Sequence, residues 1–533
     1  MKTELMASVP TADDVHVEEA DHDVTPEPGL ASRRDVLFGS ALMAMFAAGC
    51  PTTAPPPPPG PPPPGPGPNP GPGPVPPPPP PPSSTLRRLI ERITFGANKE
   101  EMQLANSLGY NGYLEYHLNA GAIDNSEFVP WMAPYPFLSM TGREFKEYES
   151  SSYWRRKKFI GATVVRSLYN KRQLQERMSE FWTDHFNIYI YKSWQDTLKM
   201  VDDREVIRKN ALGNFPAMFR ASAHSPAMLA YLDNDPSSNE APNENYAREM
   251  MELHVLGVDQ FTQEDVENVA KCLTGWSFDW SSSSPAYLNF VFREDKHDYG
   301  AKRVLGHDIP AGGGQSDGET LLDILTTDPN LVPITANFIG RKIASKFWGD
   351  NPPAALVTDV ANAYIATGGE IKAMLRAVLA PQWLSSAPMK LKRPYHLAIS
   401  SLRATDAWID HDYAMYFLEN SLEHMGHSPY GWAPPNGYPD ASGFWSGLLL
   451  PRWRFGADVV LKHEDIRLAL DEYFQDPDPD ALMNTIDSMV YGGLLTDSDR
   501  AAMHQYVSVN PLDLLRRLET LGLAFASPGF QWY

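Results

Sequence analysis

The chain of 533 residues is 42% hydrophobic and 11% aromatic, which supplies enough apolar material for a large buried core and excludes disorder along the whole length. Its formal net charge of −21 at pH 7 excludes a nucleic-acid partner, because phosphate binding needs clustered Lys and Arg side chains and the sequence holds no such cluster. Cys50 and Cys272 are the two cysteines, and since Cys50 is expected to carry lipid, an intramolecular disulfide is excluded as well.

Residues 32–50 predict an export signal, which follows an acidic N-terminal extension over residues 1–31. Arg33 and Arg34 stand directly before an apolar run at 36–48 that is too short to cross a bilayer but is typical of a signal peptide. An arginine pair at this place is typical of the twin-arginine signal, which is read by export machinery that carries folded proteins. An ordinary secretory signal that contains two arginines is the alternative.

The end of this signal predicts a lipid anchor. Residues 47–50 read Ala-Ala-Gly-Cys and resemble the lipobox of bacterial lipoproteins, although Ala47 departs from the more usual Leu. A diacylglycerol on the Cys50 sulfur carries two acyl chains, which suffice for stable membrane anchoring. We therefore expect a periplasmic or cell-surface lipoprotein at the outer membrane, whose partners are the membrane, the export machinery, and an extracellular glycan or another exported protein.

A proline-rich linker is predicted over residues 51–84. Residues 51–82 contain 22 prolines, so this stretch forms no core and is expected to be a disordered, extended spacer. At about 3.1 Å per residue it can reach roughly 100 Å. Residues 85–533 are then expected to form one globular domain held away from the membrane.

Apolar residues recur at helical spacing through most of this domain, which predicts a mainly α fold, a large multi-helix globular domain. The expected helical segments are 86–93, 99–108, 159–189, 201–211, 244–256, 262–273, 320–325, 334–347, 353–366, 371–379 and several within 480–525. Cys272 falls inside one of them, where a buried structural thiol is expected in preference to a nucleophile. The clearest strand pattern, 287–292 followed by 302–305, predicts a small β-hairpin insertion around 287–305.

The segment between Asp233 and Glu244 has the ligand spacing of a calcium-binding loop. Oxygen-bearing side chains occupy its positions one, three, five, seven and twelve: Asp233, Asp235, Ser237, Asn239 and Glu244. Calcium takes six to eight hard oxygen ligands, so this loop predicts a possible Ca²⁺ site. Ser238 stands where such loops have a Gly for the sharp turn, and a capping loop before a helix is the alternative.

Two helical segments each place a histidine among apolar side chains, His185 in 173–187 and His254 in 244–256. Polar residues flank them at Asp184, Arg248, Glu249 and Glu252. Because a buried imidazole needs hydrogen-bond partners, we expect the two histidines to meet inside the domain, with Glu249 and Glu252 near enough to complete an acid–base or metal site. Alternatively each is a hydrogen-bonded core histidine beside a solvated polar face.

Other motifs narrow the chemistry. The common phosphate-loop, serine-hydrolase elbow, zinc-protease and haem-attachment patterns are absent from the sequence, so those mechanisms are disfavoured. Four tryptophans lie in Gly-, Pro- and Ser-rich loops, where an indole either stacks on a sugar ring or anchors the loop onto the helical body: Trp276, Trp280, Trp432 and Trp445.

From about residue 86 to 533 the chain resembles the bacterial family known as "domain of unknown function 1800". The resemblance rests on short motifs in a fixed order, at 92–96, 181–186 (Phe-Trp-Thr-Asp-His-Phe), 225–229, 231–233, 242–257, 273–276, 297–298, 392–394 and 525–531. It implies an exported, mostly helical protein and carries no known activity or catalytic residue. Because His185, Glu249, Glu252 and His254 fall within these motifs, the resemblance favours a role for the two histidine-bearing segments.

Three functional hypotheses follow. The first is an exported hydrolase that acts on an extracellular polymer, glycan first, through buried His and carboxylate side chains. The second is a non-catalytic surface protein that binds a glycan or another exported protein. The third is a metal-cofactor or redox protein that is exported folded. A cleft lined by His185 and His254 favours the first hypothesis, and a closed core at that point favours the second.

Overall fold

A computed structural model describes residues 84–409, 413–461, 466–470, 473 and 475–533. The mainly α fold is confirmed: the described residues are mostly helical, with three two-stranded antiparallel sheets. The export signal, Cys50 and all of the proline-rich linker except Ser84 lie outside the described residues. Among the described helices, none combines the length and the apolar composition that crossing a bilayer requires.

The largest hydrophobic core joins the first helices of the domain to the helices of its middle third. Ser84 begins this part, because its hydroxyl accepts a hydrogen bond from the Arg87 amide and caps the first helix. The helices around this core are α2 (Thr85–Ile93), α3 (Lys99–Leu118), α7 (Gln173–His185), α9 (Phe215–Ala223), α10 (Pro226–Tyr231), α11 (Glu244–Glu249), π-helix η5 (Met250–Val255), α12 (Gln263–Cys272), α13 (Ser316–Thr327), α14 (Val332–Phe347), α15 (Ala354–Thr367), α16 (Ile371–Val378) and α17 (Pro381–Leu384).

A second core joins the C-terminal helices, and a smaller third core lies under α5 and α6. These C-terminal helices are α18 (Pro394–Ala404), α19 (Tyr413–His424), α21 (Leu449–Leu461), α23 (Pro479–Ile486), η7 (Asp487–Tyr491), α24 (Asp497–Ser508), α25 (Leu514–Ala526) and α26 (Pro528–Gln531). The short helix α20 (Ser442–Trp445) packs through Trp445 in a separate small cluster with Leu391, Tyr438 and Trp532. Around the third core lie α4 (Val129–Met132), α5 (Gly142–Tyr148), α6 (Ser152–Tyr169) and α8 (Gln195–Asp202). The π-helix η4 (Asp203–Arg208) follows α8 and contributes Val206 and Ile207 to the largest core.

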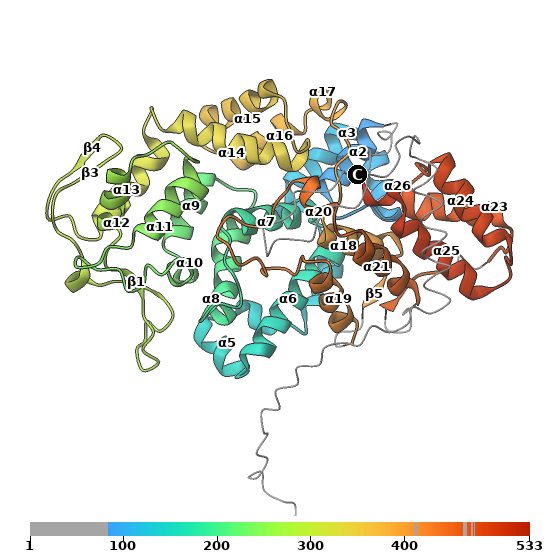
Figure 1. Cartoon of the computed structure of the whole chain (residues 1–533), viewed down its shortest axis with the longest axis horizontal. Coiled ribbons are helices and arrows are strands. Elements are labelled where there is room, and N and C mark those ends of the chain that lie inside the picture. Colours follow the sequence, from blue (N-terminus) through green and yellow to red (C-terminus); the bar gives the residue numbers. More distant parts are fainter. Residues whose placement is uncertain (1–83, 410–412, 462–465, 471–472, 474) are drawn as a thin grey trace, which may run out of the picture.

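The molecule is elongated, with α12, α13 and the strands β1 to β4 at one end and α23 to α25 at the other (Figure 1). The C-terminal residue returns to the middle beside α2 and α3. There the backbone amides and carbonyls of Lys390 and Tyr533 exchange two hydrogen bonds, of 2.9 and 3.0 Å. The chain end thus closes the junction between the two larger cores.

The small β insertion is present, but the predicted pairing of 287–292 with 302–305 is wrong. Strand β2 (Phe290–Phe292) pairs with β1 (Trp276–Phe278), and β3 (Lys302–Val304) pairs with β4 (His307–Ile309). Leu305 and Gly306 both have positive φ, of 50° and 87°, which forms the tight two-residue turn that joins β3 to β4. A third pair, β5 (Trp408–Ile409) with β6 (Ile466–Arg467), lies near the second core.

Two of the predicted helices differ from those observed. The segment 159–189 is broken in two, because the backbone of Asn170 is extended and ends α6 before α7 begins. The segment 244–256 remains helical but widens into the π-helix η5, where the Leu256 amide donates to the Met251 carbonyl. A wider turn changes the angle between successive side chains, so the faces predicted from α-helical spacing do not hold beyond Met250.

Candidate functional site

The structure places His185 and His254 side by side in the largest core. Their ring centroids are 6.2 Å apart, and both residues are at most 3% exposed. The Nε2 atom of His185 lies 3.0 Å from the His254 carbonyl oxygen, to which it donates. Aromatic rings close the site on several sides, with Phe186, Phe215 and Phe338 within 6.3 Å of the His185 centroid.

The partner of His185 is a lysine that the sequence analysis missed. Nζ of Lys342, on α14, donates to Nδ1 of His185 at 2.9 Å. Burial and the charge of Lys342 hold the pKa of His185 well below its usual range, and they lower the pKa of His254 to about 3. Burial also lowers the pKa of Lys342 to about 8, against the attraction of Asp184. Both histidines are therefore neutral at neutral pH.

The predicted carboxylate partners take no part in this arrangement. Within the described residues, no hydrogen bond or ion pair joins Glu249 or Glu252 to either imidazole. Arg248 donates to Gln263, and Nε2 of the buried His254 is left without a hydrogen-bond partner among the described atoms. The π-helix η5 explains the difference, since it separates His254 from the α-helical phase of Glu249.

Asp184 faces away from the histidines into a buried ion network. Arg393, at the start of α18, donates to Asp184 at 2.6 Å and also to Glu180. Arg177 and Lys346 each lie 2.9 Å from a Glu180 oxygen. Burial opposes ionisation of Glu180, but the surrounding cations hold its pKa well below the usual range, whereas burial raises the pKa of Asp184.

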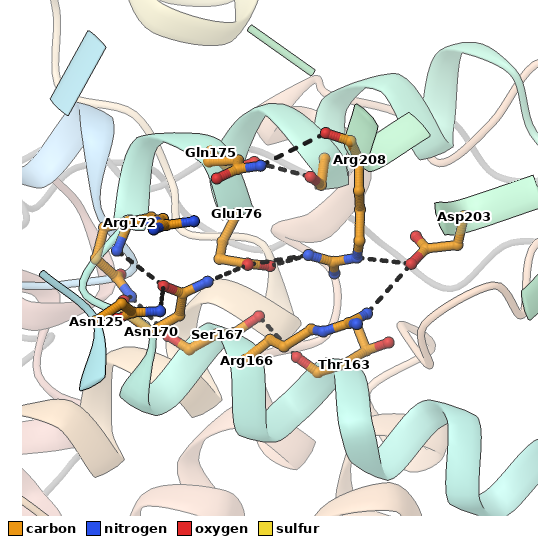
Figure 2. A network of polar contacts seen from close by, with 12 residues as sticks. Asn125, Thr163, Arg166, Ser167, Asn170, Arg172, Gln175, Glu176, Asp203 and Arg208 are labelled. Atoms are coloured by element: carbon orange, nitrogen blue, oxygen red, sulfur yellow. Dashed lines mark hydrogen bonds and ion pairs between the residues drawn. The ribbon is translucent and has the colours of Figure 1, made fainter. Parts of the chain in front are cut away.

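A second ion network lies one turn away along α7 (Figure 2). Arg208 donates to both oxygens of Glu176, at 2.9 and 2.7 Å, and to Asp203 at 2.6 Å. Arg166 lies 3.4 Å from the same Asp203 oxygen, and Asn170 donates to Glu176 at 2.6 Å. Burial opposes ionisation of Asp203, but Arg208 and Arg166 lower its pKa.

A cavity of about 40 Å³ lies between the two networks. Its charged lining consists of Glu176, Glu180, Asp184, Asp203, Arg208 and Arg393. A space of this size holds a few water molecules, since one water needs roughly 10–15 Å³ measured in the same way. The two networks therefore join helices inside the domain and offer no room for a polymer substrate.

Three of the five predicted calcium ligands, Asp233, Ser237 and Glu244, form hydrogen bonds with other side chains or the backbone. Asp233 accepts from Lys192 at 2.6 Å, and Glu244 accepts from Gln263 at 2.7 Å. The Ser237 hydroxyl accepts from the amide of Asn243, whose own side chain caps α11. Asp235 is half-buried and Asn239 is exposed. These contacts are those of a capping loop, and calcium binding stays a prediction.

The four tryptophans predicted to lie in loops divide by exposure. Trp276 and Trp445 are at most 1% exposed, and they lie in β1 and α20, so the loop prediction is wrong for these two. Trp432 is half-buried, and its indole donates to Asn436. Trp280 is 43% exposed under the guanidinium of Arg293.

Cys272 is fully buried, and burial raises the pKa of its thiol to about 12, which fits the structural role expected for it.

A much larger opening than the cavity between the two networks lies elsewhere, at the ends of α3, α6 and α18. We call it the acidic groove; its volume is about 820 Å³. Three aromatic residues line it together with carboxylates, amides and two cations: Tyr116, Trp131, Tyr169, Asn98, Glu100, Glu101, Gln103, Asp124, Glu127, Asn170, Lys171, Arg403 and Asp406. The sequence analysis missed this groove, because its residues come from four separate segments and share no motif.

One wall of the acidic groove is an aromatic platform. The rings of Trp131 and Tyr169 stack with centroids 3.7 Å apart and an interplanar angle of 12°. The Tyr169 hydroxyl donates to the Ala407 carbonyl and accepts from the Ile409 amide, both at 2.9 Å. These two hydrogen bonds fix the ring on which Trp131 rests.

Two carboxylates that line the acidic groove, the buried Glu101 and the exposed Asp406, have opposite pKa shifts. Burial alone raises the pKa of Glu101, but His117, Arg403 and Tyr113 together lower it, with Tyr113 and His117 at 2.5 and 3.0 Å. Burial raises the pKa of Asp406, which accepts from Asn98 at 3.1 Å. Of the two carboxylates, Asp406 is therefore the more easily protonated and Glu101 the more readily ionised.

A family model described as "Protein of unknown function (DUF1800)" matches residues 88–532. The chain belongs to this family. The resemblance recognised in its ordered motifs is thereby confirmed over almost the whole folded domain. No curated protein and no solved structure matches the chain. The function of this DUF1800 domain is therefore inferred from the geometry of the sites described above.

Proposed function

We propose that this DUF1800 protein is exported through the twin-arginine pathway, is held at the outer membrane by lipid on Cys50, and binds an extracellular glycan in the acidic groove. The observation that carries the proposal is the Trp131–Tyr169 platform beside a polar lining in a groove of about 820 Å³. That volume lies within the range of about 300–1,000 Å³ that is usual for ligand sites.

Sugar rings pair well with such a lining. The C–H face of a pyranose packs on an indole or phenol ring, while the ring hydroxyls need donors and acceptors around it. The acidic groove supplies both, with amides at Asn98, Gln103 and Asn170 and carboxylates at Glu100 and Asp406. The enclosed His185–His254 pair, by contrast, favours a structural role for the histidines.

Hydrolysis of the bound glycan is a second candidate, favoured by the carboxylates that line the acidic groove. Glycoside hydrolysis generally uses one protonated carboxyl to protonate the leaving oxygen and one carboxylate that attacks the sugar or activates water. Opposite pKa shifts at Asp406 and Glu101 fit such an assignment, with Asp406 as the acid. A metal-cofactor protein has less support, because no group of three or more His, Cys, Asp or Glu side chains in the described residues is arranged to hold a metal ion.

Substitution of Trp131 tests the proposed binding. Trp131→Ala removes half of the platform, so we expect the affinity for a retained glycan to fall at least tenfold, measured by affinity electrophoresis against a panel of bacterial polysaccharides. Trp280→Ala is the matched control, because Trp280 is an exposed indole in a loop outside the acidic groove. Equal retention of the two variants and the native protein on every polysaccharide contradicts the proposal.

The anchor and the second candidate have separate tests. Cys50→Ala is expected to release the protein from membranes in soluble form, and continued membrane retention contradicts the lipid anchor.

If the acidic groove hydrolyses the glycan, Asp406→Asn is expected to lower the release of reducing ends by about 10² to 10⁴-fold while glycan binding persists. Unchanged release in that variant removes Asp406 from the reaction.

A further inference from the structure

A second hollow of the surface, of about 230 Å³, gathers three exposed tyrosines between α6 and α19. Tyr153, Tyr191 and Tyr416 are 47%, 41% and 59% exposed, and we call this hollow the tyrosine pocket. Single exposed aromatic side chains are common on protein surfaces, whereas a group of them around one hollow is typical of a binding site. The remaining lining is polar or charged: Arg156, Lys157, Asn420 and Glu423.

Two helix faces build the tyrosine pocket. Tyr416, Asn420 and Glu423 follow one another at four- and three-residue spacing on α19, so they share one face. Arg156 and Lys157 lie three and four residues after Tyr153 on α6, which places them on a facing stripe. The two helices lie side by side (Figure 1), and Lys157 reaches across to form an ion pair with Glu419.

The two cations of the tyrosine pocket differ in their partners. Lys157 already has carboxylate partners on α19, since it forms an ion pair with the buried Glu419 and lies 4.0 Å from Glu423. The Arg156 guanidinium lies over the ring of Tyr191, 5.2 Å from its centroid, and forms no ion pair with a carboxylate in the described part of the chain. A planar guanidinium with open donors and an aromatic ring beneath it is suited to a carboxylate ligand, which it can bind through two parallel hydrogen bonds.

We propose that the tyrosine pocket binds an acidic sugar unit, a uronate, with its carboxylate on Arg156 and its pyranose ring against Tyr416. Asn420 and Glu423 are placed to bond the ring hydroxyls. A cationic ligand fits less well, because Arg156 and Lys157 already lie over the rings of Tyr191 and Tyr153. The formal net charge of −21 disfavours non-specific attraction of a polyanion, so recognition depends on this local guanidinium.

This inference names a ligand class and a site separate from the acidic groove, so the two are tested independently. Calorimetric titration of the full-length protein compares tetragalacturonate with cellotetraose, its uncharged counterpart. We expect the uronate to bind at least tenfold more tightly. Arg156→Ala is expected to remove that preference, and Tyr416→Ala to weaken the binding of the uronate. Arg454→Ala, a change at an exposed arginine on α21, is expected to leave both unchanged.

Four results overturn the inference. The first is equal affinity for the charged and the uncharged sugar, and the second is an unchanged preference in a folded Arg156→Ala variant. The third is loss of uronate binding in Trp131→Ala alone, which assigns the acidic sugar to the acidic groove and leaves the proposed glycan binding intact. Dextran sulfate binding as tightly as tetragalacturonate also contradicts recognition of a uronate, because it shows a response to charge alone.

Discussion

The histidine pair and the acidic groove are opposite kinds of polar site. His185 and His254 are enclosed by aromatic rings, and burial with the charge of Lys342 keeps them neutral. The acidic groove instead opens to the surface with a volume of about 820 Å³, and its half-buried aromatic platform lies among polar side chains. A buried polar cluster stabilises one arrangement of helices, whereas ligand binding needs polar groups that a solute can reach. Perturbed titration alone therefore does not identify the functional site in this domain.

The strongest test of the structural half of this comparison is Arg393→Ala. The substitution leaves Glu180 and Asp184 buried without their shared guanidinium, so we expect the free energy of unfolding to fall by about 3–5 kcal/mol. Urea denaturation followed by circular dichroism measures the change. Arg454→Ala, at an exposed pair with Asp458, is the control and is expected to stay within about 0.5 kcal/mol of the native protein. A similar small loss in both variants contradicts a stabilising role for the buried network.

The pH dependence of stability gives the next largest effect. Because the pKa of His254 is about 3 in the folded protein and about 6.5 in the unfolded chain, its contribution is present above pH 6.5 and is lost as the pH falls toward 3. Between pH 8 and pH 5 this one group lowers the free energy of unfolding by about 2 kcal/mol. His254→Gln is expected to flatten the profile by that amount. An unchanged slope in a folded variant contradicts this, because it shows that the pKa of His254 is the same in the folded and the unfolded protein.

Lys342→Met is expected to have the smallest effect of these variants on the free energy of unfolding. It removes a desolvated ammonium from the core but keeps much of its volume, so the free energy of unfolding at pH 7 is expected to change by less than about 1.5 kcal/mol. The pKa of His185 is expected to rise, because one cause of its depression is removed, and ¹H–¹⁵N NMR titration of the imidazole measures this. Loss of glycan binding or hydrolysis in a folded variant instead places Lys342 in the functional site.

Much of the fold was predictable because its helices bury regular apolar faces. The same regularity placed His185 and His254 on inward faces. The predicted contact of Glu249 and Glu252 with the histidines is wrong, because η5 departs from α-helical spacing at Met250. The predicted strand pairing is wrong because the left-handed turn at Leu305, which joins β3 to β4, has no strong sequence signal.

Local sequence patterns do not predict the binding surfaces. Trp131, Tyr169 and Asp406 come from segments far apart in the chain, and only tertiary packing brings them to one groove. Lys342 was missed for the same reason, because its partner His185 lies 157 positions away. Local periodicity reports which side of a helix is buried and gives no information on which distant segment covers it.

The claim that the acidic groove binds the glycan and the histidine pair does not is tested most directly by the glycan affinities of His185→Gln and Trp131→Ala. Affinity electrophoresis on one retained polysaccharide measures both variants side by side, and their melting temperatures show whether they are folded. We predict that His185→Gln keeps the native affinity, because the histidine is enclosed in the core. Trp131→Ala is predicted to lose at least tenfold in affinity, because it removes half of the aromatic platform that lines the acidic groove. Loss of affinity in a folded His185→Gln variant, with Trp131→Ala unaffected, contradicts the assignment of the groove as the functional site.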